Sequence, residues 1–236
     1  MNIKKILKKM KYPGKELEVF DKAVIFQKYT YHLIKAYLGK SILEIGAGLG
    51  SFTRHYISSD RLILLNDLDN FNFNFLKKKF KTKKNIRITK TKIKNINKKF
   101  NTIIYLNVLE HIKSDKQEII NAFNKLKKNG NLIFLVPAHQ KLYTKFDRAI
   151  GHYRRYEADF FKNSKPKKAI IKKLIYLDFL GYLLYFFNKI FFKEEVYPSK
   201  YKILLWDKIF MPITIIIDFF TQYKFGKNIL CVYKKL

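Results

Sequence analysis

Three glycines at alternate positions form the first group of residues whose spacing could support chemistry. Gly46, Gly48 and Gly50 are three of only nine glycines in the 236-residue chain, and they directly follow the short segment 42–45, ILEI. Glycine is placed where the backbone must turn tightly or where a ligand approaches it closely. A glycine-rich turn from a strand into a helix cradles nucleotide ligands in parallel sheets. The segment therefore predicts a first strand, a ligand-binding turn and a helix that opens at Ser51.

Asp67 is the second candidate binding residue, 17 positions after Gly50 at the end of the apolar run 61–66. If this run forms the neighbouring strand, the Asp67 carboxylate can accept hydrogen bonds from both hydroxyls of a nucleotide ribose. Asp69 lies on the same side but also precedes a predicted helix, so we assign it to the helix N-cap. The dinucleotide fingerprint does not fit, because it requires a glycine at the position of Ser51.

The segment 107–112, with the sequence NVLEHI, follows a predicted fourth strand at 102–106. Together with the glycine turn, Asp67 and an acid two positions before the first glycine (Glu44), this segment resembles the motifs of class I S-adenosylmethionine-dependent methyltransferases. The resemblance implies S-adenosylmethionine as the cofactor, with the residues after the fourth strand around its methionine end. The cofactor-binding residues implied in this way are Glu44, Gly46, Ala47, Gly48, Gly50, Asp67, Leu68, Asn107, Leu109 and His111.

The chain departs from that family at the adenine site. An acidic residue that often contacts the adenine amine would follow the third strand, predicted at 85–91, but Lys92 stands there and no Asp or Glu occurs between 80 and 108. We therefore expect backbone groups and apolar walls to hold the adenine. We expect His111, although close to the cofactor, to pack rather than react.

The loop 137–156 is the second region of potential chemistry, and it should open into the site because it follows the predicted fifth strand, 131–136. Three of the six arginines and two of the five histidines lie in it, in a chain whose other basic residues are mostly lysines. Arginine offers planar paired donors for a phosphate or carboxylate. We predict an anion-recognition and catalytic loop, with His139 and His152 as candidate bases and Asp147 as their orienting group. The candidate catalytic residues are His139, Asp147, His152, Arg154, Arg155 and Tyr156; no metal ligands are assigned.

A purely structural role also remains open for this loop. The arginines could simply pair with Asp147 and Glu157, which would suit one of them better than all three. Methyl transfer itself needs mainly alignment of the acceptor with an already activated methyl group, plus a base if the acceptor is a hydroxyl. The loop sequence FDRAIGHYRRY resembles that of a subset of bacterial and archaeal class I methyltransferases that often accompany glycosyltransferase and cell-envelope genes. This resemblance implies a small-molecule or lipid- or saccharide-linked acceptor, and the arginines predict that the acceptor is anionic.

The order of the remaining elements sets the expected fold. Alternating strands and helices predict an α/β, Rossmann-like sheet of seven strands with helices on both faces. The sheet should be mostly parallel, with strand six at 169–177 and a last, antiparallel strand at 228–234. A helix is expected from Asp115, with Glu118 as its capping-box partner, to Lys128. We predict one domain over 1–236, with a basic leader at 1–20 and an apolar helical cap or insertion at 178–225.

Composition limits the cellular setting. The net charge is +31, yet 43 of the 49 basic residues are lysines scattered over the whole chain, as a biased genome would produce. The single cysteine, Cys231, fits a reducing compartment, and residues 1–15 lack the apolar core of a signal peptide. We expect a cytoplasmic protein. The apolar runs near the C-terminus are too short to span a bilayer, but with the lysines they could dip into the inner face of a membrane.

Two other functions follow from the same observations. The charge favours an RNA methyltransferase, and nucleic acid remains an alternative partner, although the chain shows no separate RNA-binding module and no motif for base amines. A non-catalytic S-adenosylmethionine-binding protein is the other alternative.

Overall fold

A seven-stranded sheet forms the centre of the protein. The structure is a computed structural model that describes residues 15–191 and 199–236. The strands follow the order β3-β2-β1-β4-β5-β7-β6 across the sheet. Their bounds are β1 Ser41–Ile45, β2 Leu62–Asn66, β3 Ile86–Thr89, β4 Phe100–Leu106, β5 Leu126–Pro137, β6 Ala169–Leu177 and β7 Asn228–Lys235.

The strand directions confirm the predicted sheet. Strands β1 to β5 pair in parallel, whereas β7 runs antiparallel to both of its neighbours, β5 and β6. The polypeptide therefore reverses direction only in its last strand, which lies one place from the edge. Parallel strands finish at a common edge, and ligands bind there in sheets of this kind.

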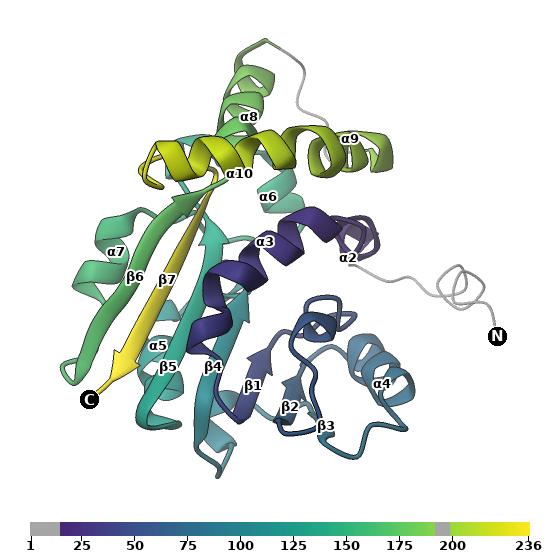
Figure 1. Cartoon of the computed structure of the whole chain (residues 1–236), viewed down its shortest axis with the longest axis vertical. Helices are drawn as coiled ribbons and strands as arrows, with labels where there is room; N and C mark the ends of the chain where they lie inside the picture. Colours follow the sequence, from purple (N-terminus) through teal and green to yellow (C-terminus); the bar gives the residue numbers. More distant parts are fainter. Residues whose placement is uncertain (1–14, 192–198) are drawn as a thin grey trace.

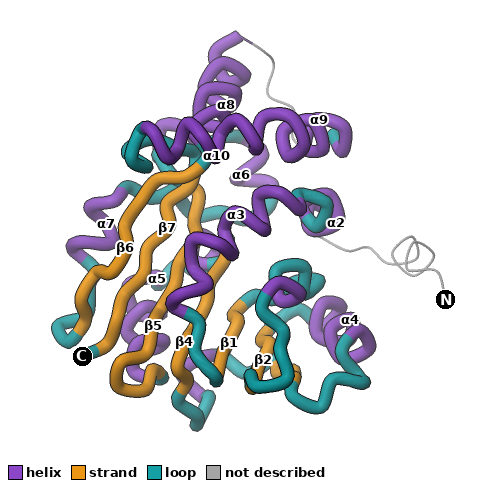
Figure 2. The backbone as a smooth tube through the Cα atoms, in the orientation of Figure 1, coloured by secondary structure: helices purple, strands orange, loops and turns teal. Residues whose placement is uncertain are grey.

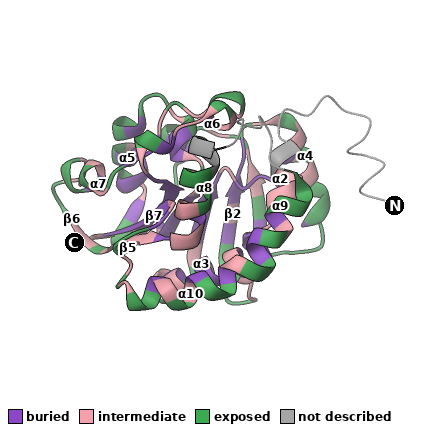
Figure 3. Cartoon of the chain, turned by 90° about the horizontal axis from the view of Figure 1, so that it is seen from above, coloured by how far each residue is buried: buried purple, intermediate pink, exposed green. Residues whose placement is uncertain are grey.

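Helices cover both faces of the sheet (Figures 1 and 2), as predicted. Seen from above, α3 and α10 lie on one side of the strands and α5 and α7 on the other (Figure 3). Alternate residues of each strand enter opposite cores, so that Leu43 packs with Phe123 while Ile42 packs with Leu76. The α-helices are α2 Lys15–Phe20, α3 Val24–Ile34, α4 Asn70–Lys79, α5 Asp115–Asn124, α6 Lys145–Ala149, α7 Ala158–Asn163, α8 Phe179–Phe191, α9 Lys200–Leu205 and α10 Met211–Phe220.

Two predicted helices were wrong in extent. The helix expected to open at Ser51 is only a 3-10 turn, η2, at Thr53–His55, because the chain must first pass Gly50 in the left-handed region. The helix expected to reach Lys128 ends at Asn124, and β5 begins at Leu126. Leu126 pairs with Phe100 of β4, so sheet hydrogen bonding overrides the helical preference of the lysines that follow.

The predicted cap of α5 was also wrong. Ser114 occupies the N-cap position, and Asp115 is the first helical residue. The Asp115 carboxylate instead accepts hydrogen bonds from Arg154 at 2.7 Å and from the Tyr156 hydroxyl at 3.1 Å. Glu118 accepts a hydrogen bond from the Tyr105 hydroxyl. Contacts with distant parts of the chain have replaced the local capping pattern. In contrast, Asp69 does cap α4, as predicted, by accepting from the backbone N–H of Asn72.

Within the segment 178–225, the described residues 178–191 and 199–225 are mostly helical, as expected. Helices α8 and α10, with α9 and a π-helical segment, η6 (Trp206–Phe210), lie over the edge where the parallel strands finish (Figure 1). Trp206 and Met211 bury their side chains there against the core. Across the described ranges 15–191 and 199–236, no helix combines the length and apolar character needed to cross a membrane.

Candidate functional site

A cavity of about 290 Å³ opens at the edge where the parallel strands finish. The glycine turn after β1 lines one end, and the loop after β5 lines the other. Helix α2 and the side chains of Tyr185 and Trp206 from the C-terminal helical region complete its walls. Most of the lining is apolar, with a few polar groups from each end. This combination is typical of sites for small organic ligands.

The glycine turn requires its glycines for two physical reasons. Gly46 and Gly50 both have φ of 64°, a backbone region that side chains other than glycine's strongly disfavour. A Cβ on Gly46 would lie 2.4 Å from the Val108 side chain, and one on Gly50 would lie 2.7 Å from the Phe80 ring. The turn is therefore packed from beneath by neighbouring elements, which leaves its upper side for the cavity.

Two carboxylates hold this turn in place. Asp67, at the end of β2, accepts hydrogen bonds from the backbone N–H of Gly48 at 2.8 Å and from that of Asp69 at 3.0 Å. Glu44, on β1, accepts from the hydroxyls of Thr53 and Tyr56. Burial raises the pKa of Glu44 to about 7, and the two hydroxyls partly oppose this rise. Both acids are buried, and each accepts hydrogen bonds from the protein.

The structure brings most of the predicted cofactor-binding residues to the cavity. Glu44, Gly46, Ala47, Gly48, Asn107 and His111 all line it, and His111 lies beside His152 from the loop after β5, with 4.6 Å between the ring centroids. Gly50, Asp67, Leu68 and Leu109 lie outside the lining, with Leu109 fully buried and Leu68 54% exposed. Asp67 reaches the site through its bond to Gly48, so its contact with a ribose remains a prediction. Lys92 is exposed at the start of a 3-10 turn, η3 (Ile93–Asn95).

Asp147 is the centre of the opposite end. It lies in α6, where it closes a capping box with Thr144. Its carboxylate also accepts from Nδ1 of His152 at 2.8 Å and from Nε and Nη2 of Arg155 at 2.8 to 3.1 Å. Burial disfavours its charge, but the hydrogen bonds from His152 and Arg155 outweigh this and hold the pKa of Asp147 well below its usual value. The predicted orienting role of Asp147 toward His152 thus has the required geometry.

Two buried side chains at this end have polar atoms without a partner. Nη1 of Arg155 has no hydrogen bond, although Arg155 is only 7% exposed and stacks 4.5 Å from the centre of the Tyr185 ring. Both oxygens of Glu110 are also unpaired, and Glu110 is fully buried. Burial raises the pKa of Glu110 to about 8. His111 is more exposed, and partial desolvation together with the neighbouring His152 lowers its pKa. Buried polar atoms in proteins are rarely left unpaired without a functional reason.

The other predicted catalytic residues make structural contacts away from the cavity. Arg154 binds Asp115 and the carbonyl of Lys113, and the buried Tyr156 hydroxyl donates to Asp115, so these side chains fasten the loop to α5. His139 contacts Glu157 and the carbonyl of Gly226 through its two ring nitrogens and stacks on Tyr176. Of the two candidate bases, only His152 lines the cavity.

Sequence reasoning did not assign Glu110 or Tyr185 to the site. Glu110 stood in the NVLEHI segment, next to the assigned His111, and the adjacency of two ionisable residues at a strand end was the available signal. Tyr185 had no such signal, because its approach to Arg155 depends on how α8 folds back across the sheet edge.

Comparisons with known proteins agree with this architecture. The sequence profile of a family described as "Methyltransferase domain" matches residues 20–166. Coclaurine N-methyltransferase, solved with N-methylheliamine and SAH, superposes with a TM-score of 0.61 at 12% identity, covering 90% of this chain and 72% of that one. A SAM-dependent methyltransferase from Clostridium acetobutylicum gives 0.58 at 16% identity, with coverage of 94% and 98%.

A third solved structure, magnesium protoporphyrin IX methyltransferase from Synechocystis with bound SAM, has a TM-score of 0.56 at 12% identity and covers 97% of this chain and 86% of its own. None of the curated proteins compared matches the sequence significantly. At these identities the structural likeness establishes the shared fold.

Proposed function

The chain belongs to the methyltransferase-domain family, and from this we propose that it transfers the methyl group of S-adenosylmethionine to an acceptor that carries an anionic group. In this reaction a lone pair of the acceptor forms a bond to the methyl carbon while the carbon–sulfur bond breaks. S-adenosylhomocysteine leaves, and the acceptor loses a proton if it was a hydroxyl or an amine. The sulfonium is already activated, so the protein contributes mainly by aligning the two reactants.

The single observation that carries the proposal is the unpaired Nη1 of Arg155. Asp147 engages the other side of the guanidinium, and Tyr185 covers its face, so Nη1 is the donor without a partner in the protein, on a residue that lines the cavity. A carboxylate or phosphate oxygen of the acceptor would satisfy it with a charge-assisted hydrogen bond. The glycine turn lies at the other end of the same cavity, which would place the methyl donor and the acceptor face to face.

A conservative variant tests the anionic acceptor. Arg155→Lys keeps the charge beside Asp147 but removes the planar fork, so we expect KM for the acceptor to rise about tenfold or more, with affinity for S-adenosylhomocysteine within twofold of wild type. Arg148→Lys, at an exposed position of the same loop, is the matched control. An unchanged KM in Arg155→Lys would exclude this anion site.

The acceptor itself would come from a methyl-label screen. Cell extract is separated into lipid, saccharide and RNA fractions, and labelled S-adenosylmethionine is supplied with the purified protein. Label in the lipid or saccharide fraction supports the proposal. Label in the RNA fraction alone would favour the RNA alternative, and absence of heat with S-adenosylhomocysteine in calorimetry would exclude the cofactor.

An exposed apolar stripe suggests how the acceptor is presented. Ile209, Ile213, Ile216 and Phe220 follow one another at helical spacing along η6 and α10, and they are 47 to 77% exposed. Exposed lysines at positions 200, 208 and 224 lie beside this stripe in the sequence. We propose that this face docks on an anionic membrane surface, because an apolar stripe flanked by cations is the composition that such surfaces bind.

Vesicle binding tests the docking face. Sedimentation with vesicles containing phosphatidylglycerol should recover the wild-type protein, and Ile216→Glu should reduce recovery several-fold. Ile120→Glu is the control, since Ile120 is similarly exposed on α5, on another side of the molecule. If Ile216→Glu instead changes only the molecular mass measured by light scattering, the stripe joins copies of the chain and the membrane proposal fails.

A further inference from the structure

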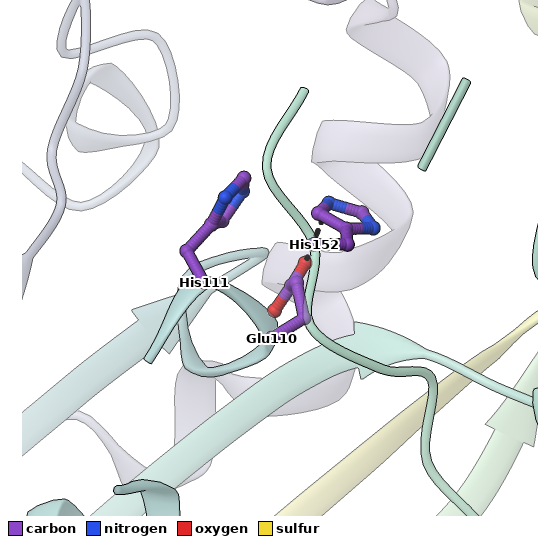
Figure 4. A group of neighbouring side chains, drawn as sticks. All are labelled: Glu110, His111 and His152. Atoms are coloured by element: carbon purple, nitrogen blue, oxygen red, sulfur yellow. Dashed lines mark ion pairs between the residues drawn. The ribbon is translucent and has the colours of Figure 1, made fainter. Parts of the chain in front are cut away.

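Three potential metal ligands converge at the end of the cavity that the loop after β5 lines, which we call the acceptor end (Figure 4). Glu110 and His111 come from the 3-10 turn η4 (Leu109–His111) after β4, and His152 comes from the loop after β5. One ligand atom from each side chain lies within 4.8 Å of the other two. All three residues line the cavity, so an ion between them could also contact a bound ligand.

Glu110 supplies the strongest sign that an occupant belongs here. It is fully buried, and neither of its oxygens has a hydrogen-bond partner. The nearest basic atom is Nε2 of His152, 3.7 Å from Oε1, which is beyond hydrogen-bond distance. An ionised carboxylate buried without partners is strongly unfavourable, and coordination of a metal is one of the ways in which proteins compensate such a charge.

The His152 ring is already oriented for coordination. Its Nδ1 is held by Asp147, so Nε2 is the nitrogen directed toward Glu110. A carboxylate on the outer nitrogen is the usual arrangement around metal-binding histidines, because it sets the tautomer and the ring orientation. Asp147 is itself held by Thr144 and Arg155, which makes this support rigid.

The geometry points to a divalent transition-metal site formed by Glu110, His111 and His152. Two imidazole nitrogens and one carboxylate favour ions such as Zn²⁺, Co²⁺ or Mn²⁺ over Mg²⁺, which prefers oxygen ligands. Three protein ligands leave a coordination position for an acceptor oxygen from the cavity, and coordination lowers the pKa of such an oxygen. The ion would thereby take over the role that the sequence suggested for a histidine base. This catalytic role rests on the proposed methyl transfer, whereas metal binding itself does not.

Spectroscopy and calorimetry on the full chain, untagged and stripped of metal, test the site. Titration with Co²⁺ should produce visible absorption bands at one ion per chain, and calorimetry with Zn²⁺ should give the same stoichiometry. Glu110→Gln, His111→Asn and His152→Asn should each weaken binding by about tenfold or more. His32→Asn, at an exposed histidine outside the cluster, should bind as wild type does.

Affinity for S-adenosylhomocysteine, measured on each variant, separates loss of the site from loss of the fold. The proposal fails if the wild-type protein takes up neither ion, or if variants that retain the nucleoside bind metal as tightly as wild type. Metal binding without any methyl transfer would uphold the site and overturn the proposed function. Methyl transfer by a protein that binds no metal would uphold the proposed function and overturn the metal site.

Discussion

The two ends of the cavity differ in whether their buried polar groups have hydrogen-bond partners within the protein. At the glycine turn, Glu44 and Asp67 are buried, and each accepts at least two hydrogen bonds from the protein. At the acceptor end, Glu110 is unpaired and Arg155 keeps one donor free. The two carboxylates at the cofactor end thus have hydrogen-bond partners within the protein, whereas Glu110 and one nitrogen of Arg155 at the acceptor end lack them.

This difference shows where each half derives its specificity. Backbone conformation defines the cofactor end. The positive φ angles of the glycines and the side chains packed beneath them restrict the backbone of the turn. Charge defines the acceptor end, where one carboxylate, Asp147, holds a histidine and an arginine together. We therefore expect substitutions at the two ends to affect different measured properties of the protein.

The largest effect is expected at Asp147. Asp147→Asn leaves the buried Arg155 without its counterion, and we expect the free energy of unfolding to fall by about 3–5 kcal/mol in urea denaturation. Asp159→Asn is the control, because Asp159 pairs with Lys162 on the surface, where both side chains are more than half exposed and an ion pair contributes little to stability. Equal losses in the two variants would show that charge does not define the acceptor end.

The pH dependence of stability should come next in size, and it probes the cofactor end. The pKa of Glu44 is raised from 4.5 to about 7, so between these values the folded protein holds a proton that the unfolded chain releases. Stability from this group is therefore unchanged below about pH 4.5 and declines by up to about 3 kcal/mol as the pH rises through 7. Lys79 and Asp67 are the charged groups that act on it.

In Glu44→Gln the side chain at this position cannot ionise. The free energy of unfolding of the variant should therefore rise relative to that of wild type as the pH increases from about 4.5 to above 7. Urea denaturation at intervals between pH 4.5 and 8 measures the difference. Parallel curves for the two proteins would contradict the raised pKa.

A smaller effect is expected at Gly46. Gly46→Ala introduces a Cβ at positive φ, 2.4 Å from Val108, and the turn must shift. We expect affinity for S-adenosylhomocysteine to fall about 10- to 100-fold, as for a strain of 1–3 kcal/mol. Gly151→Ala is the matched control, since Gly151 also has positive φ but belongs to the acceptor loop, and calorimetry should find the nucleoside affinity retained. Similar losses at both glycines would remove the distinction between the two ends.

The smallest effect is expected for Arg154→Ala. Arg154 is about one-third exposed and binds Asp115, which keeps its hydrogen bond from Tyr156 in the variant. The free energy of unfolding should fall by about 1 kcal/mol, with the acceptor KM within twofold of wild type. A tenfold rise in KM would return Arg154 to the acceptor site.

Local sequence patterns predicted the sheet well and the ends of helices poorly. Short apolar-rich segments located all seven strands, most clearly in the centre of the sheet, because a strand buried on both faces is nearly continuously apolar. Helix ends were harder, since the end of α5 depends on where Leu126 meets Phe100 across the sheet. In the same way, Asp115 carried a local capping pattern that contacts from Arg154 and Tyr156 replaced.

The residues of the candidate site also differ in whether the sequence alone could assign them. Gly46, Gly48 and Asn107 could be assigned from the sequence because they follow strand ends directly, and a parallel sheet places such ends together. The three arginines of the acceptor loop could not be told apart in this way. Arg155 enters the cavity while its neighbour Arg154 turns to Asp115, and successive side chains of an extended segment point in opposite directions.

The sequence by itself determined the α/β class, the mostly parallel sheet that creates a binding edge and the turn that can receive a nucleoside, since these depend on local periodicity and on glycine. Only the tertiary structure decided which buried charges find partners. His152 is far in the chain from the adjacent pair Glu110 and His111, and the three meet because two loops close over one cavity. Pairing of buried charges depends on distances of a few ångströms between such loops, and no local pattern encodes those distances.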